Sequence, residues 1–274
     1  MVALIDGLRG WWRRLAGAPA QVPESLWAGV EATLPFLDFL SNEERAQLRG
    51  LAREFLAHKQ FHGASGLELT DRMLLSIALQ ACLPILHIGL DAYRGWVGVV
   101  VYPGGFIIPR SQADEAGVVH EYDDEVLGEA WAHGPVLIGW DIDETGDEAA
   151  DGLNVVIHEF VHKLDMLNGE ADGLPPLPAG MSRTEWARVF TEAYDQFCEL
   201  VDSGLPTVLD PYAAEHPAEF FAVASETFFE APHRLQTAFP EVYGQLSRFY
   251  RMDPAARATH SEPDDGARIQ PGGD

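Results

Sequence analysis

Two histidines four residues apart, His158 and His162, enclose a glutamate in the sequence His-Glu-Phe-Val-His. On a helix, side chains at positions i and i+4 lie one above the other, so both imidazoles can bind one ion. Zinc fits this pair because neutral imidazole is a preferred ligand and a catalytic zinc needs only three protein ligands, which leaves one position for water. Glu159 can then accept a proton from that water as a general base. The motif therefore predicts a catalytic zinc site with His158 and His162 as ligands.

The segment that carries this motif is expected to be a helix. Acidic residues near its expected start, and Asn168-Gly169 as its expected stop, favour this assignment. The acids are Asp147, Glu148 and Asp151. Apolar residues recur at helical spacing and mark the side that faces the core: Leu153, Ile157, Phe160, Val161 and Leu164. Because His158, His162 and Asp165 share a neighbouring stripe, we expect the ligands to border a cleft.

A third ligand is expected on the helix predicted for residues 217–230, whose first residue is a proline. Glu219 and Glu226 stand seven residues apart among apolar residues there, on one helix face. A carboxylate among buried phenylalanines is costly unless a metal or a hydrogen-bond donor compensates it. Spacing alone does not choose between the two glutamates, and a solvent-facing position is the alternative for each. Asp165 is a further candidate, although a hydrogen bond to a ligand or a salt bridge is its commoner role. Among the other histidines, only His216 is close enough in sequence to this helix to be considered.

The remaining chain predicts scaffold helices and a few strands. Ser41 and Glu44 form a capping box that opens a helix ending near His58, and a second helix is predicted over residues 71–83. A further helix is predicted over residues 184–201, after a loop rich in glycine and proline.

Residues 96–109 predict two strands around a Pro-Gly-Gly turn, and residues 134–140 predict another strand. Since this last strand directly precedes the metal-binding helix, we expect it to border the cleft. Its edge would then be available to an extended peptide.

Charge and cysteine content exclude several classes of protein. The 274 residues include 18 basic and 43 acidic side chains, a formal charge of −25, which repels nucleic acid and anionic membranes. No apolar run is long enough to span a membrane, and the first 20 residues do not form a secretory signal, so we expect a cytoplasmic protein. Cys82 and Cys198 have apolar neighbours, which predicts two buried free thiols.

Several motifs together resemble the Mlc titration factor A family, also called the DgsA anti-repressor family. The longest motifs are residues 157–165, 210–214 and 217–226. Shorter ones are Cys82-Leu83-Pro84, Tyr102-Pro103 and residues 134–137, so the likeness extends over roughly residues 35–255.

This resemblance implies a gluzincin-type zinc metallopeptidase related in its catalytic core to anthrax lethal factor. The family pattern places the third zinc ligand on Glu219, with Glu226 behind the ligands or structural. It also has a tyrosine seven residues before that glutamate, which Tyr212 matches. A phenol there can donate a hydrogen bond to the oxyanion that forms when water attacks a peptide carbonyl. Family members show aminopeptidase-type activity, and the enterobacterial member binds the glucose repressor Mlc.

The sequence therefore predicts an α+β, zincin-like (gluzincin) metallopeptidase with a small mixed sheet and additional N-terminal helices. The expected segments are an N-terminal segment (1–22), a helical part (23–95), a catalytic part (96–253) and a disordered acidic tail (254–274). One Zn²⁺ ion would be bound, Glu159 and Tyr212 would be catalytic, and peptides would be the substrates. The expected oligomeric state is a monomer. A non-catalytic protein that sequesters an Mlc-type repressor is the alternative, and both roles can coexist.

Overall fold

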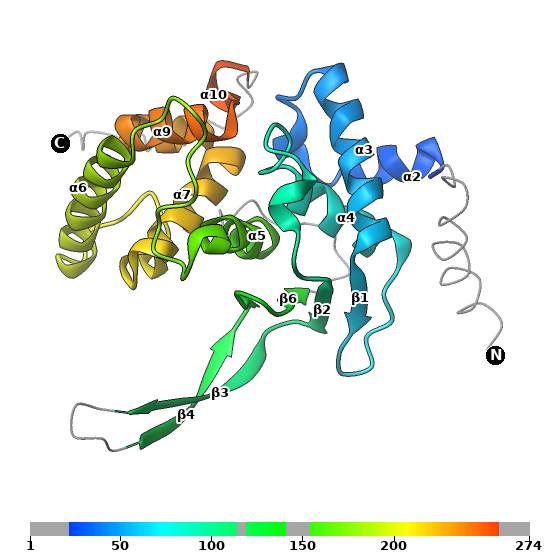
Figure 1. Ribbon diagram of the computed structural model, residues 1–274, viewed down its shortest axis with the longest axis horizontal. Helices are drawn as coiled ribbons and strands as arrows, with labels where there is room; N and C mark the ends of the chain where they lie inside the picture. Colours follow the sequence, from blue (N-terminus) through cyan, green and yellow to red (C-terminus); the bar gives the residue numbers. More distant parts are fainter. Residues whose placement is uncertain (1–21, 114–118, 141–153, 258–274) are drawn as a thin grey trace, which may run out of the picture.

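A small mixed sheet lies beneath a layer of helices in the computed structural model, which describes residues 22–113, 119–140 and 154–257 (Figure 1). The strands of this sheet stand in the order β1-β2-β6-β5. Their bounds are β1 (Gln60–Gly63), β2 (Gly98–Pro103), β5 (Gly128–Ala130) and β6 (Val136–Trp140). The pairs β1·β2 and β2·β6 are parallel, whereas β5 is antiparallel to β6. The predicted mixed α+β fold with a small sheet is confirmed.

The strand that we expected to offer a free edge is β6, and this expectation is wrong. β6 is paired with β2 on one side and with β5 on the other. The end strands of this sheet are β1 and β5. The end strand that packs on α5 is β5, a three-residue strand that its sequence pattern did not reveal.

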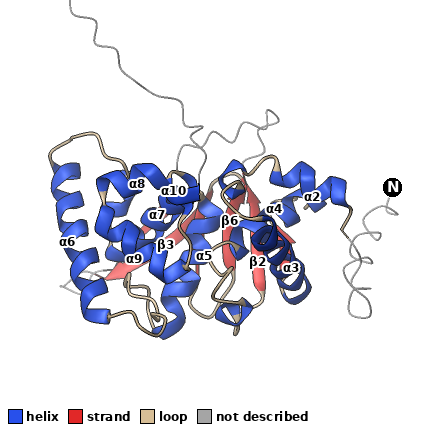
Figure 2. Cartoon of the chain, turned by 90° about the horizontal axis from the view of Figure 1, so that it is seen from above, coloured by secondary structure: helices blue, strands red, loops and turns tan. Residues whose placement is uncertain are grey.

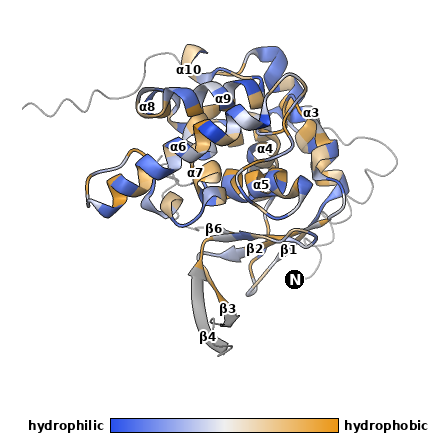
Figure 3. Cartoon of the chain, turned by 60° about the vertical axis from the view of Figure 1, so that its left-hand side comes forward, coloured by the Kyte–Doolittle hydropathy of each residue, from blue (hydrophilic) through white to orange (hydrophobic). Residues whose placement is uncertain are grey.

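A second, two-stranded sheet extends away from the first one. It consists of β3 (Phe106–Ala113) and β4 (Val119–Val126), and it projects on the side opposite to the helices (Figures 1 and 3). The two strands predicted around the Pro-Gly-Gly turn are present, but they belong to different sheets. At the turn, the amide of Gly104 donates to the Trp140 carbonyl at 2.8 Å. Gly104 has a φ of +84°, which a glycine adopts without strain and which directs the chain out of the first sheet.

The N-terminal helices are α2 (Glu24–Glu31), α3 (Asn42–His58) and α4 (Asp71–Cys82), with the 3₁₀ turns η1 (Pro35–Leu37) and η2 (Leu90–Tyr93). The predicted capping box of α3 is confirmed, because Ser41 and Glu44 exchange side-chain and backbone hydrogen bonds. Residues 23–95 were expected to be helical, yet they also contribute β1. The chain before residue 96 thus shares one sheet with the chain after it.

The C-terminal helices are α5 (Val155–Asp165), α6 (Arg183–Asp202), α7 (Pro217–Glu230), α8 (Pro232–Ala238), α9 (Pro240–Tyr250) and α10 (Pro254–Arg257). The 3₁₀ turns η3 (Met166–Asn168) and η4 (Pro211–Ala214) lie between them. The predicted bounds of α7 are confirmed. Residues 254–257, which we expected to be disordered, form α10 with Pro254 and Ala255 buried. The rest of the tail and almost all of the N-terminal segment lie outside the described residues.

Helix α5 is fixed between the N-terminal helices and the group α6 to α9 (Figure 2). On one side Phe160 packs against Phe55, Tyr93 and Trp96, with ring centroids 5.3–5.8 Å away. Complete burial of one such ring contributes about 1.5–3 kcal/mol. The other side of α5 packs on α7. A helix held on both sides in this way can position side chains accurately.

Both cysteines are free, but only Cys82 is fully buried, and Cys198 is half-buried. Burial raises the pKa of the Cys82 thiol. Among the described helices, none combines the length and the apolar content needed to cross a membrane.

Candidate metal centre

The helix that carries both histidines begins at Val155. Asn154 caps it, because its side chain accepts a hydrogen bond from the amide of Ile157 at 2.9 Å. The acidic residues that we expected near the helix start lie outside the described residues. At the other end α5 stops at Asp165, before the predicted Asn168-Gly169 stop. The 3₁₀ turn η3 carries the chain on to Asn168, and Gly169 then has a φ of +150°.

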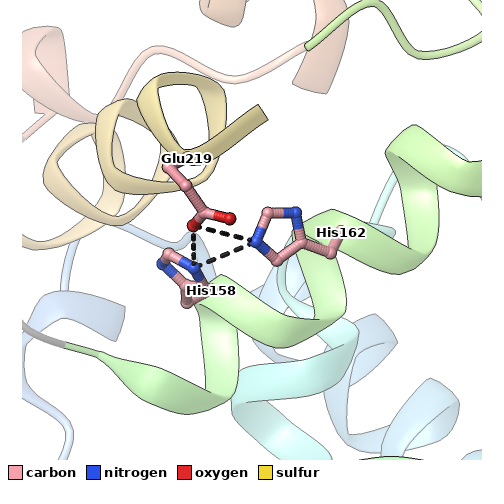
Figure 4. Close-up of side chains that lie close together, drawn as sticks. All are labelled: His158, His162 and Glu219. Carbon is pink, nitrogen blue, oxygen red and sulfur yellow. Dashed lines mark hydrogen bonds and ion pairs between the residues drawn. The ribbon is translucent and has the colours of Figure 1, made fainter. Parts of the chain in front are cut away.

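The side chains of His158, His162 and Glu219 converge between α5 and α7 (Figure 4). His158 Nε2 lies 3.0 Å from His162 Nε2 and 2.9 Å from Glu219 Oε2. His162 Nε2 lies 3.2 Å from the same carboxylate oxygen. All three side chains are largely buried, with Glu219 the most exposed at 19%. Two imidazole nitrogens and one carboxylate oxygen therefore form a nearly equilateral triangle.

This triangle has the dimensions of a zinc ligand set. Ligand atoms about 2.0–2.1 Å from a tetrahedral ion are about 3.3 Å apart, close to the three separations here. The donor set of two imidazoles and one carboxylate is also the set found in catalytic zinc sites that keep a position open. Three protein donors that face one point fit a single divalent ion.

Glu226 lies behind His158, on the side away from the triangle. Its Oε1 is 2.5 Å from His158 Nδ1, and its Oε2 accepts a hydrogen bond from the amide of Asn154 at 2.7 Å. Asn154 also donates from its side chain to Glu230 at 2.8 Å. The buried carboxylate of Glu226 thus joins α7 to the start of α5 and fixes the orientation of the His158 ring.

The carboxylates around His158 make this region attractive to positive charge. Burial by itself lowers the pKa of His158, but the nearby Glu226 and the hydrogen bond with Glu219 outweigh it and raise the pKa well above its usual value. Burial would raise the pKa of Glu219, whereas its hydrogen bonds with His158 and His162 hold it well below the usual range. The same carboxylates that stabilise a protonated imidazole would stabilise a bound cation.

Glu159 follows His158 about 100° around α5 and lies against the edge strand β5. It is only 4% exposed, and its Oε2 has no hydrogen-bond partner within the described residues. Burial raises the pKa of Glu159 to about 8, and its attraction to His158 offsets only part of this effect. Glu219 and Glu226 raise the pKa further by repulsion. A carboxylate whose proton affinity is raised in this way suits a group that accepts and returns a proton.

Tyr212 lies near the triangle, on η4. Its ring centroid is 6.1 Å from that of His158, and the residue is 45% exposed. Asp210 holds the turn by accepting a hydrogen bond from the Tyr212 amide at 2.8 Å. His216 does not join the triangle, because it caps α7: its Nδ1 accepts from the amide of Ala218 at 3.2 Å.

Asp165 is buried, but it is not one of the three converging residues. Its Oδ2 accepts a hydrogen bond from the amide of Gly173 at 2.7 Å. The Gly173 carbonyl in turn accepts from the indole of Trp186 at 2.9 Å. Asp165 therefore holds the loop that follows α5 against α6.

The contact between β5 and Glu159 was not predicted. Strand β5 (Gly128–Ala130) is too short to show an alternating pattern, and Gly128 is distant from Glu159 in sequence. A short strand-like run between two turns was the only available signal.

Comparison with known proteins supports the metal-binding character of these helices. The profile of a family described as glucose-regulated metallo-peptidase M90 matches residues 8–251. An uncharacterized protein of Synechocystis is 35% identical over 262 residues, covering 93% of this chain and 94% of its own. Mlc titration factor A of Pectobacterium atrosepticum is 39% identical over 229 residues, covering 82% and 85%. The protein of the same name from Salmonella arizonae is 36% identical over 250 residues, covering 90% and 98%.

The packed helices of this α+β chain bring two imidazoles and a carboxylate together, and its sequence matches a peptidase profile. The chain is therefore of the metallopeptidase class. More narrowly, this chain belongs to the glucose-regulated metallo-peptidase M90 family.

Proposed function

We propose that this protein is a zinc-dependent peptidase of the gluzincin type, with aminopeptidase-like activity. The observation that carries the proposal is the triangle of His158, His162 and Glu219, with Glu159 next to it on the same helix. In this proposal the first three residues hold one Zn²⁺ ion. The fold would then be zincin-like, with α5 as the active-site helix.

The reaction needs a nucleophilic water and a polarised carbonyl, and a bound zinc ion supplies both effects. Glu159 accepts the proton of the attacking water on its carboxylate and afterwards donates it to the leaving amine. Its low exposure excludes bulk water, so the proton stays in the site. Tyr212 donates a hydrogen bond from its phenol to the substrate oxygen as negative charge develops there. The half-exposed position of Tyr212 beside His158 places it on the open side, where a substrate can enter.

The edge strand β5 supports a peptide substrate in particular. It is an end strand of the four-stranded sheet, and an extended peptide can add to such a strand through backbone hydrogen bonds. Because β5 packs on Glu159, a peptide bound there would lie close to the general base.

Two substitutions test the proposal. Glu159→Gln should retain zinc at one ion per chain and lose peptide hydrolysis, because the amide cannot accept the proton. His162→Ala should lose both zinc and activity. Glu192→Gln on the exposed face of α6 and His133→Ala on an exposed loop serve as matched controls and should retain both. Peptide cleavage by Glu159→Gln at the parent rate would overturn the proposed mechanism.

A second candidate function is the binding of a repressor of the Mlc type, which the name of the Pectobacterium and Salmonella relatives favours. A sequestering surface does not need a proton-accepting Glu159. We therefore expect Glu159→Gln to retain repressor binding in a pull-down if this second function is present. Retained binding together with lost hydrolysis would show two separable functions in one chain.

A further inference from the structure

The edge strand β5 passes directly over Glu159 at Gly128. A Cβ atom built on Gly128 would overlap Glu159 Oε1 and would lie 2.7 Å from both Glu159 Cγ and Val155 Cγ2. Real Cβ atoms essentially never approach other atoms so closely. Only a residue without a side chain allows the strand and this part of α5 to touch.

Neither backbone is free to move apart to make room for a larger residue. β5 is paired with β6 along its whole length, and the Gly139 amide also donates to the Leu127 carbonyl at 2.6 Å. At the other end of the strand, the buried amine of Lys163 donates to the Trp131 carbonyl at 2.6 Å. Helix α5 is held by its buried side chains, among which Phe160 is fully buried. An added methyl group at Gly128 must therefore displace the Glu159 side chain.

Packing is also what holds Glu159 in place. Its Oε2 is buried and makes no hydrogen bond to any described residue. Without such a bond, the shape of the space around the carboxylate decides where it lies, and the floor of that space is the bare backbone of Gly128.

We infer that Gly128 is a positioning residue, whose missing side chain sets the place of the Glu159 carboxylate relative to His158, His162 and Glu219. This inference rests on the proposed role of Glu159 as general base. Gly128 itself touches no reacting atom in this arrangement. It acts through the side chain that it leaves room for.

Gly128→Ala tests the inference through activity. A displacement of about 1 Å at a catalytic group can lower a rate by about 100-fold, so we expect kcat for peptide cleavage to fall by about this factor. The KM should change little, and zinc should remain at one ion per chain, because no proposed ligand is touched.

Gly244→Ala on α9, where a Cβ meets nothing within 4 Å, is the benign control. Gly63→Ala on β1, where a Cβ would overlap the Leu67 carbonyl oxygen, is the control for a strained strand outside the site. Loss of thermal stability without loss of kcat is expected there.

A second measurement needs no activity. In a Glu159→Ala background the added methyl group meets no carboxylate, so Gly128→Ala should lower the melting temperature clearly less than it does in the parent chain. Equal shifts in both backgrounds, or an unchanged kcat in Gly128→Ala, would overturn the inference. If the parent chain loaded with zinc cleaves no peptide, the proposed function fails instead, whereas the thermal comparison still tests the contact.

Discussion

Glu226 offers the sharpest test of how the site is held together. Its carboxylate accepts from the Asn154 amide at 2.7 Å and contacts His158 Nδ1 at 2.5 Å, and it is 1% exposed. Glu226→Ala leaves these two buried donors without a partner, at about 1–3 kcal/mol each. Without Glu226 the fold no longer has to bury a negative charge, which offsets part of this loss. We therefore expect the free energy of unfolding to fall by about 2–4 kcal/mol. Glu226→Gln keeps the size of the side chain and one hydrogen-bond acceptor, so it should lower the free energy of unfolding by about half as much as Glu226→Ala does.

The effect on metal affinity follows from the His158 ring. When Glu226 accepts a hydrogen bond from Nδ1–H of His158, the lone pair of Nε2 is left free to bind the proposed ion. Loss of such a partner typically weakens metal binding by about 10- to 100-fold, which we expect for Glu226→Gln. Zinc affinity is measured by competition with a chromophoric chelator, and stability by thermal unfolding of the metal-free protein.

Glu230→Gln is a matched control for this experiment, because Glu230 lies on the same helix and accepts a hydrogen bond from the Asn154 side chain, and it is not one of the residues that converge with His158 and His162. It should lower stability slightly and leave zinc affinity unchanged. Equal zinc affinities for the parent chain, Glu226→Gln and Glu230→Gln would refute the role given to Glu226.

Three further outcomes are expected. Removal of zinc with a chelator should lower the melting temperature, since a ligand at about 1,000 times its Kd stabilises a fold by about 4 kcal/mol, and His162→Ala should abolish this difference. Asp165→Ala should cost about 1–3 kcal/mol of unfolding free energy because the Gly173 amide loses its partner, and a melting curve like that of the parent would contradict this. Although burial raises the pKa of Glu44, its hydrogen bond with Arg257 and other contacts lower it from 4.5 to about 2. The charged form is thus favoured by folding, so the stability difference between the parent and Glu44→Gln should be full above pH 4.5 and disappear as the pH falls toward 2. A difference that stays constant down to pH 2 would show that this carboxylate is not held as described.

Local sequence signals predicted the helices well. The start of α7 is marked by a proline and its body by a mostly apolar sequence, and the capping box of α3 specifies its first turn through hydrogen bonds between near neighbours. Both signals lie within a few residues of the structure that they specify. The same spacing logic predicted that Glu219 and Glu226 share one face of α7, and the structure places both next to His158.

Long-range pairings were not predictable in the same way. Nothing near Gly104 shows that the strands on its two sides enter different sheets, because β2 pairs with β6, which is distant from it in sequence, whereas β3 pairs with β4. The strands β1 and β5 were missed for a different reason: strands of three or four residues show no clear alternation of apolar and polar residues. The different contacts of Glu219 and Glu226 with His158 also depend on how α7 packs on α5, which spacing within one helix does not specify.

The central claim is that His158, His162 and Glu219 hold one zinc ion. Anomalous scattering measured on crystals at the zinc absorption edge tests it most directly. The account predicts a single peak about 2 Å from Nε2 of both histidines and from a carboxylate oxygen of Glu219. A peak bound instead to Glu226 or Asp165, or a chain that takes up no metal when zinc is supplied, would contradict it.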